Sequence, residues 1–366
     1  MCYSDRAPAE PGATCLDGCE VVIDVAFLPA AGLTEASYNG GMSASSKWIE
    51  GLGPECSVAQ AARRSLEPRL AAVTQALPMA AHLAAHDVEY VHRLRVATRR
   101  ASAALKLYRD CIGDKPARWT KKWLRKIRRA AGDARDLDVL ADRLAHDYGE
   151  PAAPIIDLIA KDREVVQPAI VEVAERCRQD DWFVRKTAKL LKSIGHSKAK
   201  DETQSALFRD WAKTKFAAVA DEFAVAMPNE SAQPAEMHEF RIRAKALRYA
   251  IELVAPVFGP ELRDETYPMI EELQEQLGKV QDHVAAIDRC RGWIVATRSP
   301  LLRTRLEELM SAERRGLADS VRDFRVWWTE ERAAQICAQL QTEPPTPPNL
   351  SAPGSAGGSH HAKTGE

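Results

Sequence analysis

The sequence has no long apolar run, no paired-cysteine motif and few aromatic residues. No stretch approaches the roughly 18 consecutive apolar residues of a membrane-spanning helix, so we expect no membrane association. The 8 cysteines include no CxxC pair and no Cys/His zinc pattern, which predicts reduced thiols and neither a metal nor another cofactor. Because the N-terminus also has no basic segment of the kind that begins a leader peptide, we expect a cytoplasmic protein.

Signals for β-strands are equally scarce. Apolar residues do not alternate with polar ones but recur every three or four positions from about residue 57 to residue 340. Ala, Leu, Arg, Lys and Glu, which favour helices, dominate this region. Prolines and glycines such as Pro78, Gly149 and Pro256 divide it, and these divisions predict an all-α protein of about eight helices.

The two ends differ from this helical region in composition. Residues 1–56 are rich in Gly, Ala, Ser and Pro, and residues 341–366 are rich in Pro, Gly and Ser. Neither end has a periodic apolar face that could pack against a core. We therefore expect a largely disordered N-terminal extension, one helical domain over 57–340 and a disordered tail.

The helical region contains an internal repeat at a constant offset of 146 residues. Residues 91–107 align with 237–253, and the same offset, without a gap, pairs Gly132 with Gly278. Several blocks that agree on one offset indicate two homologous halves of the chain.

We expect the first half to span 57–198 and the second half to span 203–340. Two units are too few for a solenoid, which needs at least about three repeats to bury its faces. The pattern therefore predicts two packed four-helix bundles related by a pseudo-two-fold axis.

The charges are strongly segregated, although the net charge is only −1. Between Val91 and Arg129 there are 14 Lys and Arg residues and 2 acids, whereas acids outnumber bases by 15 to 11 between Glu261 and Glu331. Because a local excess of one sign attracts partners of the other, this segregation is more informative than the net charge.

A cationic stripe follows one face of a helix in each half, since residues at i, i+3 and i+7 share a face. In the first half, the stripe consists of His92, Arg95 and Arg99. In the second half, it consists of His238, Arg241, Lys245 and Arg248. Leu94 and Phe240 fall on the opposite faces, which we expect to be buried in the core.

The ordinary alternative is a solvated helix face. Such faces usually mix signs and gain from Glu–Lys pairs one turn apart, whereas these stripes contain almost no acids. Like charges on successive turns repel and destabilise a helix. Their presence in both halves therefore indicates an anionic partner.

Further cations follow the first stripe along the chain, and six of the nine residues from Lys121 to Arg129 are basic. The additional candidate binding residues are Arg100, Lys122, Arg125, Arg128, Arg129, Arg135, Arg185 and Lys189. We interpret the acids Asp136 and Asp282 as salt-bridge partners that orient basic side chains.

These motifs, in this order, resemble one protein family. The first half reads His92-x2-Arg95-x3-Arg99 and then Gly132-x2-Arg135-Asp136-Leu137-Asp138. The second half reads His238-x2-Arg241-x3-Lys245-x2-Arg248 and then Gly278-x3-Asp282, with Gln281 in place of Arg135. The chain thus resembles the CHAD domain, the conserved histidine α-helical domain. The resemblance implies two four-helix bundles around a central basic groove that binds inorganic polyphosphate, and association with polyphosphate granules.

The residue types agree with that ligand. Polyphosphate is a flexible chain with a negative charge on each unit and no bases to read, so a site for it needs dense Lys and Arg. Nucleic-acid modules add exposed aromatic residues, whereas aromatic residues are 6 % of this chain and those near the stripes occupy expected core positions. Both His92 and His238 can donate to phosphate when they are protonated.

Two other functions stay open. A helical nucleic-acid or protein-interaction module would use the same cations; if the ligand is polyphosphate, nucleic acid is only a weaker competitor. A polyphosphate- or triphosphate-processing enzyme is disfavoured, because there is no GxxxxGK[ST] loop and no Glu-x-Glu-x-Lys strand of the triphosphate-tunnel enzymes. The sequence thus predicts a non-catalytic binding protein and gives no indication of its oligomeric state.

Overall fold

The computed structural model describes residues 47–195, 206–229 and 231–341. These residues contain eleven α-helices and no β-strand beyond one isolated bridge, which confirms the prediction of an all-α protein. The α-helices of the first half are α2 (Val58–His82), α3 (Glu89–Leu107), α4 (Asp114–Ala130), α5 (Gly132–Tyr148), α6 (Ala153–Arg178) and α7 (Trp182–Lys192). Those of the second half are α9 (Phe208–Val225), α10 (Pro234–Val254), α11 (Tyr267–Ala296), α12 (Pro300–Trp327) and α13 (Glu330–Leu340).

The helices number more than the eight that we expected, because the chain breaks at different places. Pro78, a predicted break, lies inside α2 together with Pro68, and the helix continues over 25 residues despite the missing N–H donors. The break between α4 and α5 falls at Ala131, a residue that carries no breaking signal.

Helices at the predicted offset of 146 residues have similar bounds. If α3 is shifted by this offset, it spans 235–253, and α10 spans 234–254. The helices α6 and α12 correspond in the same way, as do α7 and α13. The exception is α11, a single helix that continues through Gly278, whereas the first half has two helices, α4 and α5, over the equivalent residues.

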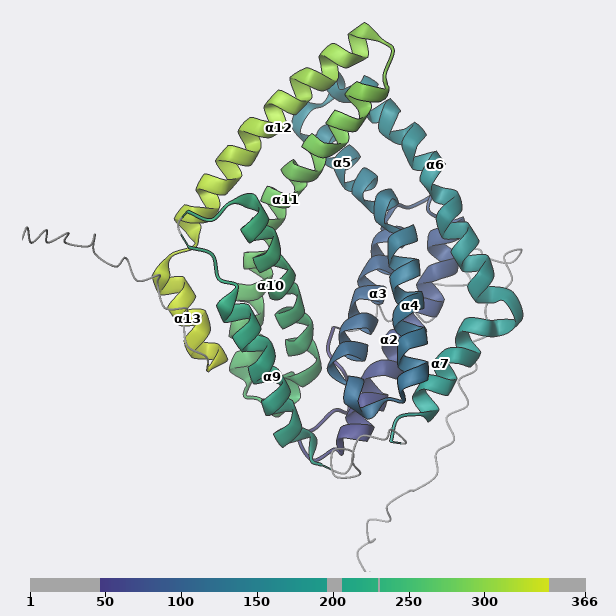
Figure 1. Cartoon of the computed structure of the whole chain (residues 1–366), viewed down its shortest axis with the longest axis vertical. Coiled ribbons are helices and arrows are strands. Elements are labelled where there is room, and N and C mark those ends of the chain that lie inside the picture. The colour runs from purple at the N-terminus through teal and green to yellow at the C-terminus, as the bar shows by residue number, and fades with distance from the viewer. Residues whose placement is uncertain (1–46, 196–205, 230, 342–366) are drawn as a thin grey trace, which may run out of the picture.

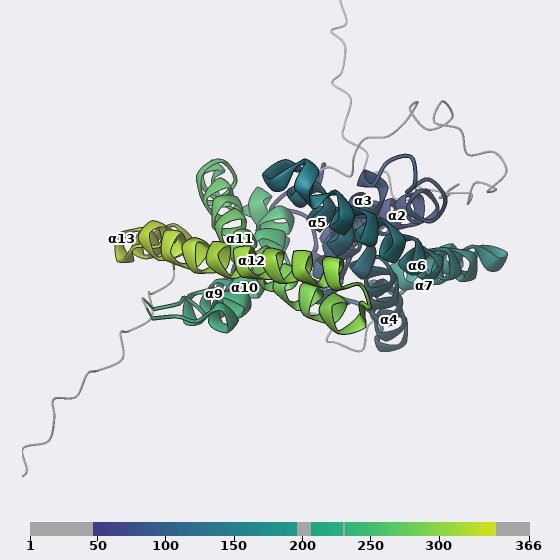
Figure 2. The same ribbon diagram turned by 90° about the horizontal axis from the view of Figure 1, so that it is seen from above.

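The two halves form opposite sides of a diamond-shaped outline, with α3 and α10 facing each other across its centre (Figure 1). At one end α5, α6, α11 and α12 converge, and the view from above shows the two halves beside each other (Figure 2). The first helices of the halves begin together, because Val58 N–H donates to the Ala206 carbonyl (3.1 Å) and Phe208 N–H donates to the Cys56 carbonyl (2.8 Å).

Two apolar clusters form the core. The larger one takes side chains from both halves, including Leu66, Leu94 and Phe240, which are fully buried. The predicted burial of Leu94 and Phe240 is thus confirmed. The smaller cluster lies where α5, α6, α11 and α12 converge and includes Leu144 and Leu306. Each such buried side chain contributes about 1.5–3 kcal/mol, so both clusters hold the halves together.

A buried glutamate fixes the second half to the first near the larger cluster. The Glu252 carboxylate on α10 is fully buried. It accepts hydrogen bonds from Arg100 Nε (2.9 Å) and Arg69 Nη1 (3.4 Å) of the first half. The Tyr267 hydroxyl also donates to it (3.1 Å). Hydrogen bonds from three side chains to one carboxylate offset the cost of removing its charge from water.

A second buried glutamate repeats this arrangement at the converging ends. Glu313 on α12 is fully buried, and each of its oxygens accepts a hydrogen bond from Arg143 of α5 at 2.9 Å. His283 Nδ1 lies 2.7 Å from the same carboxylate. Burial alone would raise the pKa of Glu313, but the hydrogen bonds from His283 and Arg143 lower it below its ordinary value. At both positions, the second half supplies the acid and the first half supplies arginine.

Residues 47–56, which we expected in the N-terminal extension, contact the helices. The Trp48 ring lies 5.0 Å from the Tyr267 ring, and the Arg263 guanidinium lies 4.7 Å above Trp48. Leu52 is buried in the larger cluster. The packed part of the chain therefore includes this segment, which covers the side of α11 next to Glu252.

None of the helices in the described ranges has both the length and the apolar character to cross a membrane. Five cysteines fall in these ranges, and all five carry free thiols. The other three, Cys2, Cys15 and Cys19, lie outside the described residues.

We predict that Glu252→Gln destabilises the fold by about 3–5 kcal/mol, because Arg69 and Arg100 would keep their charges without a buried counter-ion. The measurement is equilibrium unfolding in urea, with circular dichroism as the signal.

The matched control is Glu222→Gln, which breaks an exposed salt bridge to Arg243 (2.6 Å) and should cost at most about 1 kcal/mol. Equal losses for the two variants would contradict a central role for Glu252.

Candidate functional site

The stripes of the two halves converge where α3 faces α10. Arg99 lies within electrostatic range of both Arg241 and Lys245, and Arg95 lies within range of Lys245. Residues of α4 and α5 join them from the first half. We call this group the cation cluster: Arg95, Arg99, Arg128, Arg135, Arg241, Lys245 and Arg248.

The loop between α4 and α5 holds Arg95 in place. The guanidinium donates from Nη1 to the Ala131 carbonyl (3.3 Å) and pairs through Nη2 with Asp136 Oδ1 (3.4 Å). A Cβ on Gly132 would lie 3.2 Å from Nη1, so glycine gives the guanidinium room to approach the backbone. Burial lowers the pKa of Arg95, and Asp136 partly offsets this effect. As predicted, Asp136 orients a basic side chain.

Arg241 has similar surroundings in the second half. A Cβ on Gly278 would lie 3.8 Å from its Nη2, and Asp282 of α11 is the opposite charge that acts on it most strongly. Burial lowers the pKa of Arg241 and raises the pKa of the Asp282 carboxyl, which the positive charge of Arg241 partly offsets. Among the described residues, the buried Nε of Arg241 has no hydrogen-bond partner. Part of its donor capacity is thus free to bind an added acceptor.

Lys245 has the largest pKa shift in the cation cluster. Burial lowers its pKa to about 7, and the charges of Arg241 and Arg99 act in the same direction. An anion beside this amine would stabilise its protonated form. The free protein therefore holds Lys245 in an unfavourable electrostatic environment that a bound anion would relieve.

Arg248 stands at the end of the second stripe, above the Tyr249 ring (5.2 Å). Burial alone would lower the pKa of Arg248, but the effects of Tyr249 and Tyr267 are larger together and raise it. Its Nη1 lies 3.8 Å from Glu271, and its buried Nε has no partner among the described residues. Of the three cations that α10 contributes to the cluster, Arg241 and Arg248 therefore each keep an unused Nε donor.

The basic helix α4 enters the cluster through Arg128. Burial lowers the pKa of this half-buried arginine, and Arg99 and Arg125 lower it further. The remaining predicted residues of α4, which are Lys122, Arg125 and Arg129, are exposed along the same helix. They extend the positive charge of the cluster onto the surface.

The two predicted histidines differ in their surroundings. Burial lowers the pKa of His92, and Arg135 lowers it further, so this ring is neutral near pH 7 unless an anion approaches. His238 is exposed, and its Nδ1 is hydrogen-bonded to Gln281. Gln281 occupies the position that corresponds to Arg135 of the first half. His238 therefore has an uncharged neighbour at the position where the first half has an arginine.

Three predicted residues lie apart from the cation cluster. Arg100 binds the buried Glu252 carboxylate. The exposed Arg185 and Lys189 lie on α7, which packs through Trp182 against Trp119 of α4 (4.8 Å). Because Trp119 and Arg128 are nine residues apart, they point in opposite directions from the axis of α4.

Four aromatic residues near the stripes were expected in the core. Tyr108 and Tyr249 are buried, but Trp119 and Trp123 are only half-buried and stack beside each other with centroids 6.1 Å apart. Lys126 lies 5.1 Å above the Trp123 ring. The surface of α4 therefore combines cations with partly accessible indole rings.

Sequence reasoning missed the buried carboxylates of Glu252 and Glu313 and the lowered pKa of Lys245. The available signal for Glu252 was a single acid inside the apolar run from Ala250 to Val257. The state of Lys245 depends on α3 and α10 meeting, which one helix sequence does not reveal.

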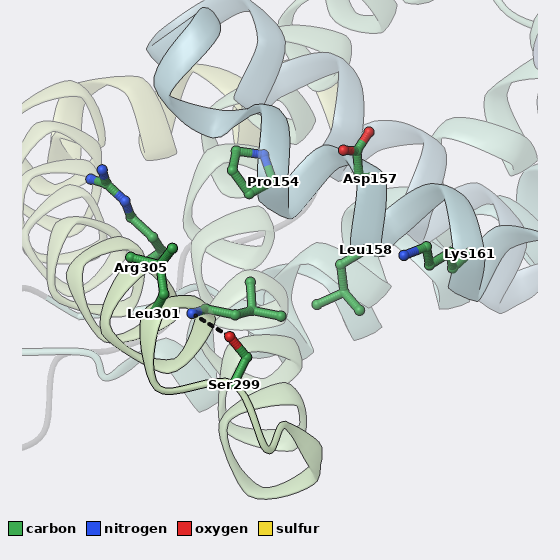
Figure 3. Close-up of a pocket in the computed structure, with 8 residues that line it drawn as sticks. Pro154, Asp157, Leu158, Lys161, Ser299, Leu301 and Arg305 are labelled. Atoms are coloured by element: carbon green, nitrogen blue, oxygen red, sulfur yellow. Dashed lines mark hydrogen bonds between the residues drawn. The ribbon is translucent and has the colours of Figure 1, made fainter.

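A separate pocket lies between α6 and α12 at the converging ends (Figure 3). Its volume is about 390 Å³, and Leu158, Lys161 and Arg305 are among its lining residues. Its lining contains both charge signs, with Asp157 and Lys161 on one side and Arg305 on the other (Figure 3). This pocket is formed by different helices from those of the cation cluster.

The arrangement is suited to holding an anion. Seven cations share the region with three nearby carboxylates, those of Asp136, Glu271 and Asp282, and each of these acts on one arginine of the cluster. Within the described ranges, no group of three His, Cys, Asp or Glu side chains could hold a metal ion. The described residues thus bring together a cluster of cations on an all-helical scaffold.

Comparison with known families agrees with this architecture. The model of the CHAD domain matches residues 64–291. This match covers most of the chain, and it includes all residues of the cation cluster. The chain therefore belongs to the CHAD domain family.

Solved structures with the same fold include the CHAD domain from the plant Ricinus communis, with a TM-score of 0.59 and 18 % sequence identity. That alignment covers 81 % of this chain and 95 % of the plant domain. PptA from Streptomyces chartreusis aligns with a TM-score of 0.52 and 16 % identity, over 76 % of this chain and 100 % of PptA. No curated protein sequence gave a significant match.

We predict that Lys245→Met stabilises the fold by at least about 1.4 kcal/mol at pH 7, the free energy of one unit of pKa displacement. The folded pKa, about 7, lies below that of an unfolded lysine, so charging Lys245 opposes folding. This penalty is complete below pH 7 and disappears as the pH rises towards 10.5. The measurement is urea unfolding of both proteins at pH 6, 7.5 and 9.

Lys213→Met on α9 removes an exposed charge and is the matched control. It should change the unfolding free energy by less than about 0.5 kcal/mol at each pH. A destabilised Lys245→Met protein at pH 6 would contradict the assigned environment of Lys245.

Proposed function

We propose that this chain binds inorganic polyphosphate without catalysing a reaction, in a basic groove lined by the cation cluster. One observation carries the proposal: the stripes of the two halves face each other across α3 and α10. A surface of seven mutually repelling cations lowers the stability of the free protein, and a polyanion would remove that repulsion.

The donor set suits phosphate in particular. Six of the seven cations are arginines, whose planar guanidinium groups bind phosphate oxygens through paired N–H donors. The free Nε donors of Arg241 and Arg248 support a ligand that accepts hydrogen bonds. The exposed cations of α4, including Arg125 and Arg129, would follow a chain-like anion beyond the cluster.

The family resemblance supports the same ligand, and from it we further propose association with polyphosphate granules in the cytoplasm. We also infer that the two halves are internal copies related by a pseudo-two-fold axis, which the matching bounds of α3 and α10 support. In this proposal the binding unit is the helical domain over 57–340, together with the segment around Trp48.

A non-catalytic role is supported by the state of the nearby acids. The Asp136 carboxylate is paired with Arg95, and Asp282 lies in the field of Arg241. An enzyme that processes phosphoanhydrides would need free carboxylates to hold metal ions or to activate water. Asp136 instead holds Arg95 in place, and the charge of Arg241 acts on Asp282.

A nucleic-acid-binding module is the second candidate. The half-buried rings of Trp119 and Trp123 beside the cations of α4 favour it, because bases stack on accessible aromatic side chains. Direct competition between the two polymers distinguishes these candidates.

The test of the proposed function is the salt dependence of polyphosphate binding. If the polymer makes about six to ten phosphate contacts, counter-ion release gives a log–log salt slope of about −4 to −7. Binding is followed by fluorescence anisotropy of labelled polyphosphate, with tRNA and duplex DNA added as competitors at equal charge concentration.

A slope near −1 would contradict a multi-contact groove and leave a site for a small anion. Displacement of polyphosphate by equal amounts of tRNA would favour the nucleic-acid module. Retained binding in the presence of both competitors supports polyphosphate as the ligand.

A second prediction concerns the contributions of the two halves. Reversing the charges of Arg95 and Arg99 should weaken binding at least about tenfold more than reversing those of Arg241 and Lys245, because only the first pair adjoins Arg128 of α4. The measurement is the dissociation constant of each double Glu variant under the same conditions.

Reversal of Arg303 and Arg305, which are exposed at the start of α12, is the matched control for the change in net charge. It should weaken binding less than either pair in the cluster. Equal losses from the two halves, or a larger loss from the second, would overturn the predicted asymmetry.

A further inference from the structure

A carboxylate joins the cation cluster to the N-terminal segment of the described chain. The side chain of Glu271 on α11 lies between Arg248, the last cation of the second stripe, and Lys47. Its Oε1 is 3.8 Å from Arg248 Nη1, and its Oε2 is 3.5 Å from Lys47 Nζ. Each oxygen of this carboxylate therefore pairs with one of the two cations.

Lys47 is held at this place by contacts that do not involve Glu271. Its ammonium group lies 4.7 Å above the Tyr267 ring, and its main-chain carbonyl accepts a hydrogen bond from Arg69 Nη2 (3.4 Å). The neighbouring Trp48 also packs against Tyr267. Lys47 lies outside the residues that match the family model, so it adds a cation beside the cluster that the family match does not include.

The two ion pairs of Glu271 are weak enough to be exchanged. Both distances exceed the roughly 2.7–2.9 Å of a charge-assisted hydrogen bond. The three side chains are 23–42 % exposed, and ion pairs that are open to water contribute at most about 1 kcal/mol. A stronger anion could therefore take the place of this carboxylate at little cost.

A phosphate chain is suited to replace the carboxylate. A phosphate group has a similar spacing between its oxygens, and the paired N–H donors of an arginine match two of them. Arg248 acts electrostatically on Arg241 and Lys245, so it is continuous with the rest of the cation cluster. A polymer that follows the cluster to Arg248 would thus meet Lys47 next, on the other side of Glu271.

We propose that Lys47 binds polyphosphate and that a phosphate unit displaces Glu271 from both Lys47 and Arg248 when the polymer binds. This inference rests on the proposed function, and it extends the path of the anion from the cation cluster to the N-terminal segment. Glu271 is an internal competitor, because it holds two cations in the free chain and gives them up to the ligand.

The test is a double-mutant cycle on the full chain, with the dissociation constant of labelled polyphosphate measured by fluorescence anisotropy. Glu271→Gln removes the competitor and should tighten binding at least about threefold. Lys47→Gln alone should weaken binding less than about twofold, because Lys47 only exchanges one anionic partner for another. In the Glu271→Gln background, the same change should weaken binding at least about threefold, because Lys47 then has no partner to give up.

The difference between the two backgrounds identifies displacement. If Glu271 only repelled the polymer from a distance, the two substitutions would act independently and their effects would add. The matched control is Glu272→Gln, which makes the same change in net charge at the next residue. Glu272 instead contacts Trp327 Nε1 (2.8 Å) and Arg332 (3.5 Å). Its substitution should change the affinity less than about twofold and show no coupling to Lys47.

A footprint tests the contact of Lys47 directly. The full chain is acetylated with N-hydroxysuccinimidyl acetate, with and without saturating polyphosphate, and peptide mass spectrometry gives the rate at each lysine. The exposed Lys213 of α9 is the internal reference. Polyphosphate should slow acetylation of Lys47 at least about threefold relative to Lys213, because the polymer covers the amine and stabilises its protonated form. Equal protection of the two lysines would contradict the contact.

Additive effects of the two substitutions would overturn the inference, as would weaker binding by the Glu271→Gln protein. Failure of the two proposals is distinguishable. If polyphosphate binds the unmodified chain with a steep salt slope but the effects add, only the extension to Lys47 is wrong. If neither the unmodified chain nor the Glu271→Gln protein binds, the proposed function is wrong and the inference fails with it. Binding by the Glu271→Gln protein alone would support Glu271 as the competitor.

Discussion

The fold depends on buried ion pairs that hold two mutually repelling surfaces together. Cations of α3 and α10 face each other, and their repulsion favours separation of the halves. Glu252 opposes this repulsion by binding Arg69 and Arg100 from the first half, and Glu313 does the same at the converging ends by binding Arg143. Because these carboxylates are out of water, their attraction is screened less than the repulsion at the partly exposed cluster. The cation cluster can therefore stay strongly positive without loss of the fold.

Much of the fold could be predicted from the sequence because it rests on local patterns. Helical periodicity gave the all-α class, and the buried positions of Leu94 and Phe240 followed from the stripe on the opposite face. The described residues form more helices than expected, because the chain also breaks where no proline or glycine was taken as a break, as at Ala131 between α4 and α5. Pro78, by contrast, is accommodated inside the long packed helix α2. The packing of Trp48 escaped prediction because it depends on Tyr267, more than two hundred residues away.

For the candidate site too, the sequence gives what depends on spacing within one helix and does not give what depends on contacts between the halves. Helical spacing alone puts Arg95 and Arg99 on one face of α3, and the structure brings this face towards Arg241. The further candidate Arg100 is adjacent to Arg99 in sequence but pairs with Glu252 of the other half. Pairing across the halves is a tertiary property, and no spacing rule within α3 contains it. The low pKa of Lys245 has the same origin, because Arg95 and Arg99 reach it from another helix.

The one-sided supply of charge in the buried ion pairs also limits how the halves can associate. Both acids belong to the second half, and the arginines that bind them belong to the first. If two copies of the first half met through this surface, they would bring buried arginines together without a carboxylate, and two copies of the second half would bury unpaired glutamates. Either homotypic pairing carries the desolvation penalty without the compensating attraction. The seam is thus chemically heterodimeric within one polypeptide, and it disfavours the pairing of two identical halves from neighbouring molecules.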